Sequence, residues 1–135
     1  MKRTILSCLL VLILFSVPFT AIAAKEVKVE VLFMNHGPLL STLNDIKALF
    51  TKYDGKIAVS WHDVDTPDGE KFMAQKKLKG HIPLVIWMDD YVKLQIDGKE
   101  IVFAGFPTGK GPYFFQGKWT MEDLRKALDQ MTTKK

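Results

Sequence analysis

The sequence predicts a single α/β domain with a mixed central β-sheet flanked by helices, following an N-terminal signal peptide. Two observations predict the fold. Strand-like apolar runs alternate with stretches in which apolar residues recur every three or four positions, which is typical of parallel strands joined by helices. The pair Asp97-Gly98 then separates two further strand-like runs and indicates an antiparallel hairpin. A sheet with both kinds of pairing is mixed.

Residues 1–23 have the features of a signal peptide. The basic residues Lys2 and Arg3 precede an apolar run that ends in Ala21-Ile22-Ala23, an A-x-A cleavage pattern. We expect export to the periplasm, cleavage near Ala23 and a mature domain at 24–135. The alternative is a retained anchor, and only through that segment would the protein meet the membrane. The apolar run is short for a full span.

The charge and the cysteine content exclude two classes of function. Lys2 and Arg3 are two of the 19 basic residues, so cleavage leaves 17 against 15 acidic residues, with no basic cluster interleaved with aromatics. We therefore expect no binding to nucleic acid. The single cysteine, Cys8, lies inside the signal segment. Without a thiol in the mature domain, thiol–disulfide oxidoreductase activity is not expected, and an enzymatic role is not favoured.

The first half of the mature domain reads as two strand–helix units. Residues 26–34 alternate and then become continuously apolar, which predicts a strand that enters a buried sheet. Residues 38–53 carry apolar side chains at helical spacing, with Pro38 in the first turn, where a missing N–H costs nothing. Residues 56–65 predict a second strand. Thr66 and Pro67 then open a helix that is expected to reach about Leu78.

The second half predicts an apolar strand, a hairpin, a loop and a closing helix. The strand covers 82–88, and the hairpin arms are 91–96 and 100–106. The final helix covers 120–131, with Thr120 and Asp123 as a capping pair. The loop at 107–119 is rich in glycine and carries the aromatic residues Tyr113, Phe114, Phe115 and Trp119. We expect these rings to cover the open face of the sheet, and the alternative is a recognition surface.

This order of elements, with Gly37-Pro38 at the first strand–helix junction and Ile82-Pro83 at the start of a later strand, resembles the thioredoxin fold. His36 to Leu39, "HGPL", falls where that family carries Cys-Gly-Pro-Cys. The resemblance covers nearly all of 24–135 and implies a thioredoxin-like domain. It also implies that Pro83 is cis and faces the substituted pair, and that Glu30 is a buried carboxylate below His36.

The departures from the family pattern decide the functional expectation. Both cysteine positions are substituted, an extra residue precedes Ile82-Pro83, and the segment from 89 to 119 is longer. In that family the groove beside the cis-proline accepts an extended polypeptide, a mode that needs no cysteine. The resemblance thus implies a redox-inactive, adaptor-like or chaperone-like module that binds an exported protein or peptide and needs no cofactor. Its expected binding residues are Met34, Asn35, His36, Gly37, Pro38, Leu39, His81, Ile82 and Pro83.

Glu30 has two interpretations. If its side chain points inward beneath His36, burial should raise its pKa unless a cation pairs with it, and a protonated Glu30 would donate a hydrogen bond. Otherwise it occupies a solvent-facing position of an alternating strand. The helix dipole at His36 favours a neutral imidazole, which can ligate a metal or accept a hydrogen bond.

Two alternative functions follow from the same residues. Met34, His36 and His81 have side chains that suit copper, so a copper-handling protein is the main alternative, although their spacing is not a recognised metal signature. An enzyme that uses His36 as a general base oriented by Glu30 is the other. His62 lies in the second predicted strand and is expected to be remote from His36 and His81.

Overall fold

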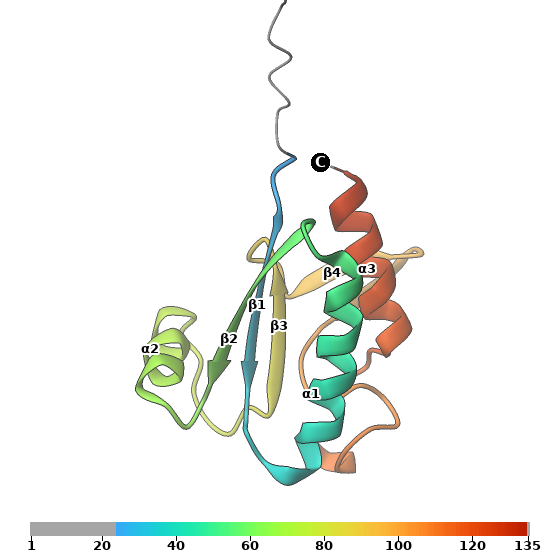
Figure 1. Ribbon diagram of the computed structural model, residues 1–135. Helices are drawn as coiled ribbons and strands as arrows, with labels where there is room; N and C mark the ends of the chain where they lie inside the picture. The colour runs from blue at the N-terminus through green and yellow to red at the C-terminus, as the bar shows by residue number, and fades with distance from the viewer. Residues whose placement is uncertain (1–23, 135) are drawn as a thin grey trace, which may run out of the picture.

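The computed structural model describes residues 24–134 (Figure 1). The expected signal peptide at 1–23 and its cleavage near Ala23 lie outside the described residues. Within 24–134, no helix combines the length and the apolar character needed to cross a membrane.

Three strands form the central sheet. They are β1 (Val27–Phe33), β2 (Ile57–Asp63) and β3 (Leu84–Met88), in the order β2-β1-β3. β1 pairs parallel with β2 and antiparallel with β3, so the prediction of a mixed sheet is confirmed. β1 is buried almost throughout because it lies between its two neighbours, which explains why its sequence becomes continuously apolar.

The predicted hairpin is also present. β4 (Lys93–Ile96) and β5 (Lys99–Val102) pair antiparallel around the Asp97-Gly98 turn. The chain after β5 then runs along the outer edge of β3. There the Ile86 N–H donates to the Phe103 carbonyl at 2.9 Å, and the Gly105 N–H donates to the Leu84 carbonyl at 2.8 Å. This edge of the central sheet is therefore covered by backbone from the same chain.

Helices cover both faces of the sheet (Figure 1). α1 (Gly37–Phe50), its 3₁₀ extension η1 (Thr51–Tyr53) and α3 (Met121–Thr133) lie on one face, and α2 (Pro67–Gln75) lies on the other. The larger core cluster joins the α1 and α3 side chains to Val27, Val29 and Val31 of β1. A smaller cluster joins Leu32 of β1 to Phe72 of α2. The two clusters take alternate residues of β1, as the two-residue period of a strand requires.

The beginnings of α2 and α3 follow the capping chemistry read from the sequence. The Thr66 hydroxyl accepts the N–H of Gly69 at 3.1 Å, and Thr120 and Asp123 form a reciprocal capping box. α2 ends at Gln75, three residues before the expected end. The chain turns at Lys77, whose φ is +57°, because the Leu78 N–H closes a wider loop onto the Met73 carbonyl.

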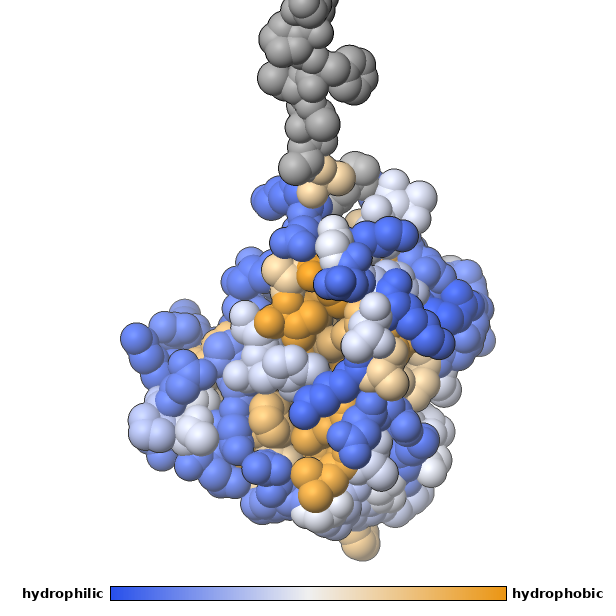
Figure 2. Space-filling model, in the orientation of Figure 1, coloured by the Kyte–Doolittle hydropathy of each residue, from blue (hydrophilic) through white to orange (hydrophobic). Residues whose placement is uncertain are grey.

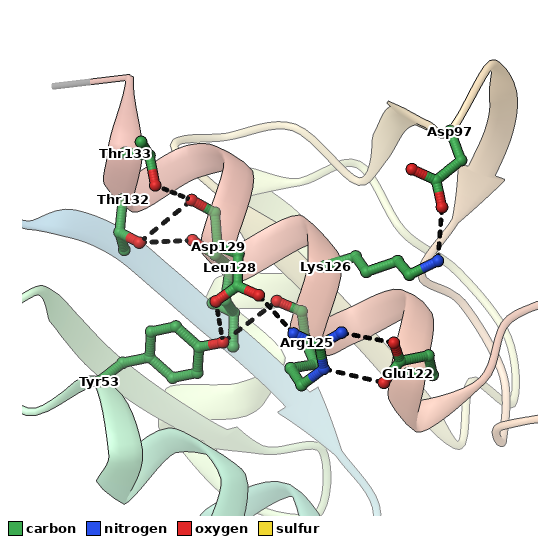
Figure 3. A network of polar contacts seen from close by, with 9 residues as sticks. All are labelled: Tyr53, Asp97, Glu122, Arg125, Lys126, Leu128, Asp129, Thr132 and Thr133. Carbon is green, nitrogen blue, oxygen red and sulfur yellow. Dashed lines mark hydrogen bonds and ion pairs between the residues drawn. The ribbon is translucent and has the colours of Figure 1, made fainter.

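A polar network ties η1 to α3 (Figure 3). The Tyr53 hydroxyl donates a 2.6 Å hydrogen bond to Asp129 and lies 3.2 Å from the carbonyl oxygen of Arg125. The Arg125 guanidinium in turn pairs with the carboxylates of Asp129 and Glu122. Burial, together with the neighbouring Asp129, raises the pKa of Tyr53 to about 12. The network therefore fixes the C-terminal helix against the end of the α1–η1 segment.

The aromatic loop divides into a buried part and an exposed part. Trp119 is fully buried, and its indole N–H donates to the Gly105 carbonyl at 3.1 Å. Tyr113 and Phe114, in the 3₁₀ turn η2 (Tyr113–Phe115), are 84% and 91% exposed. The expectation that these rings cover the sheet is confirmed for Trp119 and wrong for Tyr113 and Phe114. The turn η2 directs both rings into solvent.

Candidate functional site

The two junctions that the sequence singled out lie side by side. Antiparallel pairing of β1 with β3 places Phe33 opposite Leu84. One step further, the Met34 N–H donates to the Pro83 carbonyl at 3.0 Å. The pairing therefore brings the chain before Pro83 next to the start of α1, although the two segments are more than forty residues apart in sequence.

A small pocket lies where these junctions meet, with a volume of about 100 Å³. Six of the nine expected binding residues line it, namely Met34, His36, Pro38, Leu39, His81 and Pro83. Its walls are mainly apolar, with two imidazoles among them. Pockets for drug-sized ligands usually occupy roughly 300–1,000 Å³, so the size suits a single side chain and not a large cofactor.

The other three expected residues do not line the pocket. Asn35 and Gly37 are exposed beside it. Ile82 packs instead on the cluster beneath α2, with Leu32 and Phe72. The alternation of side chains along the segment before β3 sends Ile82 to the opposite face from Pro83.

Three lining residues were missed by the sequence reading. They are Phe106, Pro112 and Phe115. Backbone bonds bring them in, because the Phe106 N–H donates to the Phe115 carbonyl at 2.8 Å and the Gly117 N–H donates to the Phe106 carbonyl at 2.7 Å. The Phe115 ring then lies 5.4 Å from the His81 ring, centroid to centroid. The aromatic loop was visible in the sequence, but its return to the first junction was not.

The Ile82–Pro83 bond is trans, because the described residues contain no cis peptide bond. The cis-proline that the resemblance implied is therefore wrong for this structure. A trans proline is acceptable just before a strand, since it lacks only a donor. Here its carbonyl still accepts from Met34 and continues the pairing of β1 with β3.

His36 is the N-cap residue of α1, with an extended backbone at φ −110°. Its side chain does not cap the helix. Instead, Nε2 lies 3.3 Å from a carboxylate oxygen of Asp65, and both side chains are more than half exposed. Asp65 follows β2, so parallel pairing of β1 with β2 brings it to the same end of the sheet. The sequence reading did not anticipate this partner.

Glu30 is buried, as one of its two interpretations required, and its partners are two lysines. Its carboxylate is 2.8 Å from the Lys28 ammonium and 2.8 Å from the Lys76 ammonium at the end of α2. Burial opposes ionisation of Glu30, but the hydrogen bonds and charges of the two lysines outweigh it and lower its pKa. The sequence predicted a raised pKa unless a cation paired with Glu30, and two lysines do pair with it, so the stated exception holds and the pKa is lowered. Glu30 is therefore not a protonated donor, and its partners are the lysines and not His36. The paired lysines are the physical reason.

His62 is remote from the pocket, as expected. It lies on the α2 face, where its ring stacks on Phe72 at 3.8 Å between centroids. Its Nδ1 is 2.7 Å from an Asp68 carboxylate oxygen. His62 is thus held between β2 and α2 and takes no part in the site.

A larger groove lies elsewhere, between α1 and β2. It has a volume of about 380 Å³ and is lined by Lys47, Phe50, Thr51, Asp54, Ile57, Val59 and Trp61. Figure 2 shows apolar side chains at the surface on this face of the molecule. None of the residues expected from the sequence lines this groove. We place the candidate site at the smaller pocket because the two junctions converge there.

The comparisons with known proteins add no relative. No family model matches the chain, and no curated protein sequence matches it. Among residues 24–134, no three side chains of the His, Cys, Asp or Glu types gather in a way that would hold a metal ion. The geometry of the pocket is therefore the basis for a functional proposal.

Proposed function

We propose that the mature protein is a redox-inactive, thioredoxin-like binding module that holds an extended segment of an exported protein or peptide. The observation that carries the proposal is the pocket shared by Met34, His36, Pro38, Leu39, His81 and Pro83. It lies at the meeting point of a strand–helix junction and a pre-strand proline. The mixed sheet with helices on both faces is compatible with that scaffold.

The proposed binding mode uses the pocket for one apolar side chain. Apolar walls supply the hydrophobic contact, and the volume of about 100 Å³ limits the occupant to a single side chain. The imidazoles of His36 and His81 and the exposed backbone at Asn35 and Gly37 offer hydrogen bonds to the peptide main chain beside it. No step in this mode requires a thiol or a cofactor.

The test uses two fluorescein-labelled dodecapeptides in fluorescence anisotropy. The apolar peptide carries a central Leu-Phe pair flanked by asparagines, and the polar peptide carries Ser-Ser in the same place. We expect the purified protein to bind the apolar peptide and not the polar one. Phe115→Ala, which removes one wall of the pocket, should weaken binding about tenfold. The matched control is Tyr91→Ala, an exposed aromatic in the turn after β3. Equal binding of both peptides, or none, would contradict the proposal.

Copper handling is the second candidate, because Met34, His36 and His81 line one pocket. A metal held by these three side chains would bind only the folded state and raise the melting temperature. We would measure melting with excess Cu(I), Cu(II) and Zn(II), in the wild type and in His81→Ala. A rise that His81→Ala abolishes supports copper binding, and unchanged melting of the wild type removes it.

A further inference from the structure

The turn η2 presents two aromatic rings to solvent in a fixed arrangement. Tyr113 and Phe114 contact each other edge to face, with centroids 6.2 Å apart. Two backbone bonds close the turn, from the Phe115 N–H to the Pro112 carbonyl and from the Gln116 N–H to the Tyr113 carbonyl, at 3.0 and 3.2 Å. A turn held in this way loses little conformational freedom when a partner binds, which favours affinity.

The side chain of Gln116 fastens the turn to the preceding glycine-rich chain. Its Oε1 accepts the Gly109 N–H at 3.1 Å, and its Nε2 donates to the Gly111 carbonyl at 3.2 Å. Gly111 has a φ of +65° and packs against the Phe106 ring so closely that a Cβ atom would lie 2.2 Å from it. The exposed rings are therefore anchored to the wall of the pocket and not to a separate loop.

The exposed rings adjoin the pocket directly. Pro112 and Phe115, which bracket Tyr113 and Phe114, both line it. Tyr113 and Phe114 are 84% and 91% exposed, so two large apolar rings face water. Burying these rings against a partner would be favourable. We call the exposed rings of Tyr113 and Phe114 the aromatic ledge. The pocket and the aromatic ledge form one surface.

Two exposed lysines are close in sequence to residues that line the pocket, and one carboxylate, that of Asp65, reaches it through His36. Lys79 lies two residues before His81, and Lys118 lies three residues after Phe115. Both are exposed, and within 24–134 neither forms an ion pair. The first turn of α1, whose amino end carries the positive pole of the helix dipole, contains no acidic residue. Unpaired cations around an apolar surface favour a partner of opposite charge.

We propose that the aromatic ledge extends the pocket into a docking surface for a protein segment in which apolar residues are flanked by acidic ones. The inference rests on the proposed function and names the partner's chemistry. One apolar side chain enters the pocket, the next lies on the ledge, and flanking carboxylates approach Lys79 and Lys118. A bilayer surface suits the aromatic rings and lysines as well, but it cannot fill a concave pocket. A protein segment can engage both parts at once.

The experiment compares three labelled dodecapeptides in fluorescence anisotropy at 50 mM NaCl. All carry the central Leu-Phe pair, and the flanks are four aspartates, four asparagines or four lysines. We expect the aspartate peptide to bind about fivefold or more tightly than the asparagine peptide, with the lysine peptide weakest. The difference should shrink at 300 mM NaCl because salt screens exposed charges.

Two sets of variants separate charge from apolar contact. Lys79→Gln with Lys118→Gln should abolish the preference for aspartate and leave the asparagine peptide unaffected. Lys52→Gln is the matched control, since Lys52 follows α1 and lies about 20 Å along the helix from its amino end. Tyr113→Ala with Phe114→Ala should weaken all three peptides about tenfold, and Tyr91→Ala should weaken none.

The outcomes are distinguishable. If the asparagine and aspartate peptides bind equally, the charge preference is wrong while the proposed function stands. If the ledge variant binds like the wild type, the ledge is not part of the surface. If no apolar peptide binds, the proposed function itself fails. Two further results would show that a membrane or a second copy of the chain occupies the surface instead. Each counts only if Phe114→Ala abolishes it. One is co-sedimentation with phosphatidylglycerol vesicles without any peptide preference, and the other is concentration-dependent dimerisation in sedimentation velocity.

Discussion

The N–H of Met34 donates a hydrogen bond to the carbonyl of Pro83 across 3.0 Å. This bond joins the end of β1 to the chain before β3, and both of its residues line the pocket. Pro83 itself follows a trans peptide bond. The site is therefore built by sheet pairing, and its position follows from the register of β1 against β3.

A designed disulfide tests the geometry of the first junction. His36 and Leu39 are the N-cap and the third residue of α1, a separation that brings side chains to the same side of a helix. In a Cys8→Ser background, His36→Cys with Leu39→Cys should form an intramolecular bridge in oxidised glutathione, because the Cα atoms at this spacing fall within disulfide range. Mass spectrometry after alkylation measures it. Asn35→Cys with Leu40→Cys is the control that should not bridge. Free thiols in the first variant would show that the "HGPL" turn does not match a redox turn.

Replacing Glu30 should change stability in a pH-dependent way. Its pKa is lowered by Lys28 and Lys76, so its ionised form stabilises the fold above the unfolded-state pKa, and this contribution is lost as the pH falls through the lower folded-state pKa. Glu30→Gln should therefore reduce the free energy of unfolding at pH 7 by about 1–3 kcal/mol. The difference from the wild type should shrink below about pH 4, near the ordinary carboxyl pKa.

Urea unfolding at a series of pH values measures this effect. Glu100→Gln is the control, because Glu100 pairs with Lys93 at 3.1 Å on the surface and should contribute at most about 1 kcal/mol. A difference for Glu30→Gln that does not change between pH 7 and pH 3 would argue against the ion pairs as the source of the lowered pKa.

Tyr53→Phe should loosen α3. The variant removes the 2.6 Å hydrogen bond to Asp129 and should cost about 1–2 kcal/mol at pH 7 (Figure 3). Because folding raises the pKa of Tyr53 to about 12, its stabilising effect is complete below pH 10 and is lost as the pH rises toward 12. Amide hydrogen exchange in Tyr53→Phe, compared with the wild type, should accelerate more in α3 than in β1. Equal protection of α3 in both proteins would contradict this role.

Two glycines test how closely the pocket wall is packed. Gly109 and Gly111 both have positive φ angles, of +80° and +65°, but only Gly111 packs against the Phe106 ring. Both alanine variants are destabilised because alanine is strained at a positive φ angle. Gly111→Ala must also displace the Phe106 ring, so it should lower the free energy of unfolding by about 1–3 kcal/mol more than Gly109→Ala. If thermal and urea unfolding show the same loss of stability in both variants, the Phe106 ring can move aside without a measurable energetic penalty.

Sequence periodicity was sufficient for much of the fold. The alternation in 26–34 and the helical spacing in 38–53 predicted β1 and α1 because each pattern reflects the burial of one side of an element. Asp97-Gly98 predicted the hairpin since its turn type demands those residues. The central sheet is mixed for another reason than the one expected, because β3 pairs antiparallel with β1 while the hairpin forms a separate two-stranded sheet. The convergence of the two junctions was implied by the resemblance and not by these local signals.

The parts of the site that sequence could not give depend on long-range contacts. Lys28 is only two residues from Glu30, but Lys76 reaches the same carboxylate from 46 positions away, and this second cation could not be assigned until the end of α2 was placed. Phe106 and Phe115 reach the pocket through backbone bonds between irregular segments, which carry no periodic signal. The outward direction of Tyr113 and Phe114 is set by the turn after Pro112, and apolar composition alone suggested the opposite.

The most direct test of the central claim maps where a peptide binds. We would record ¹H–¹⁵N correlation spectra of the protein during titration with the asparagine-flanked Leu-Phe peptide. We predict the largest shifts at Met34, His36, Leu39, His81 and Phe115, with little change at the Trp61 indole in the α1–β2 groove. Shifts that concentrate at Trp61 and Lys47, and leave the pocket residues unmoved, would contradict it.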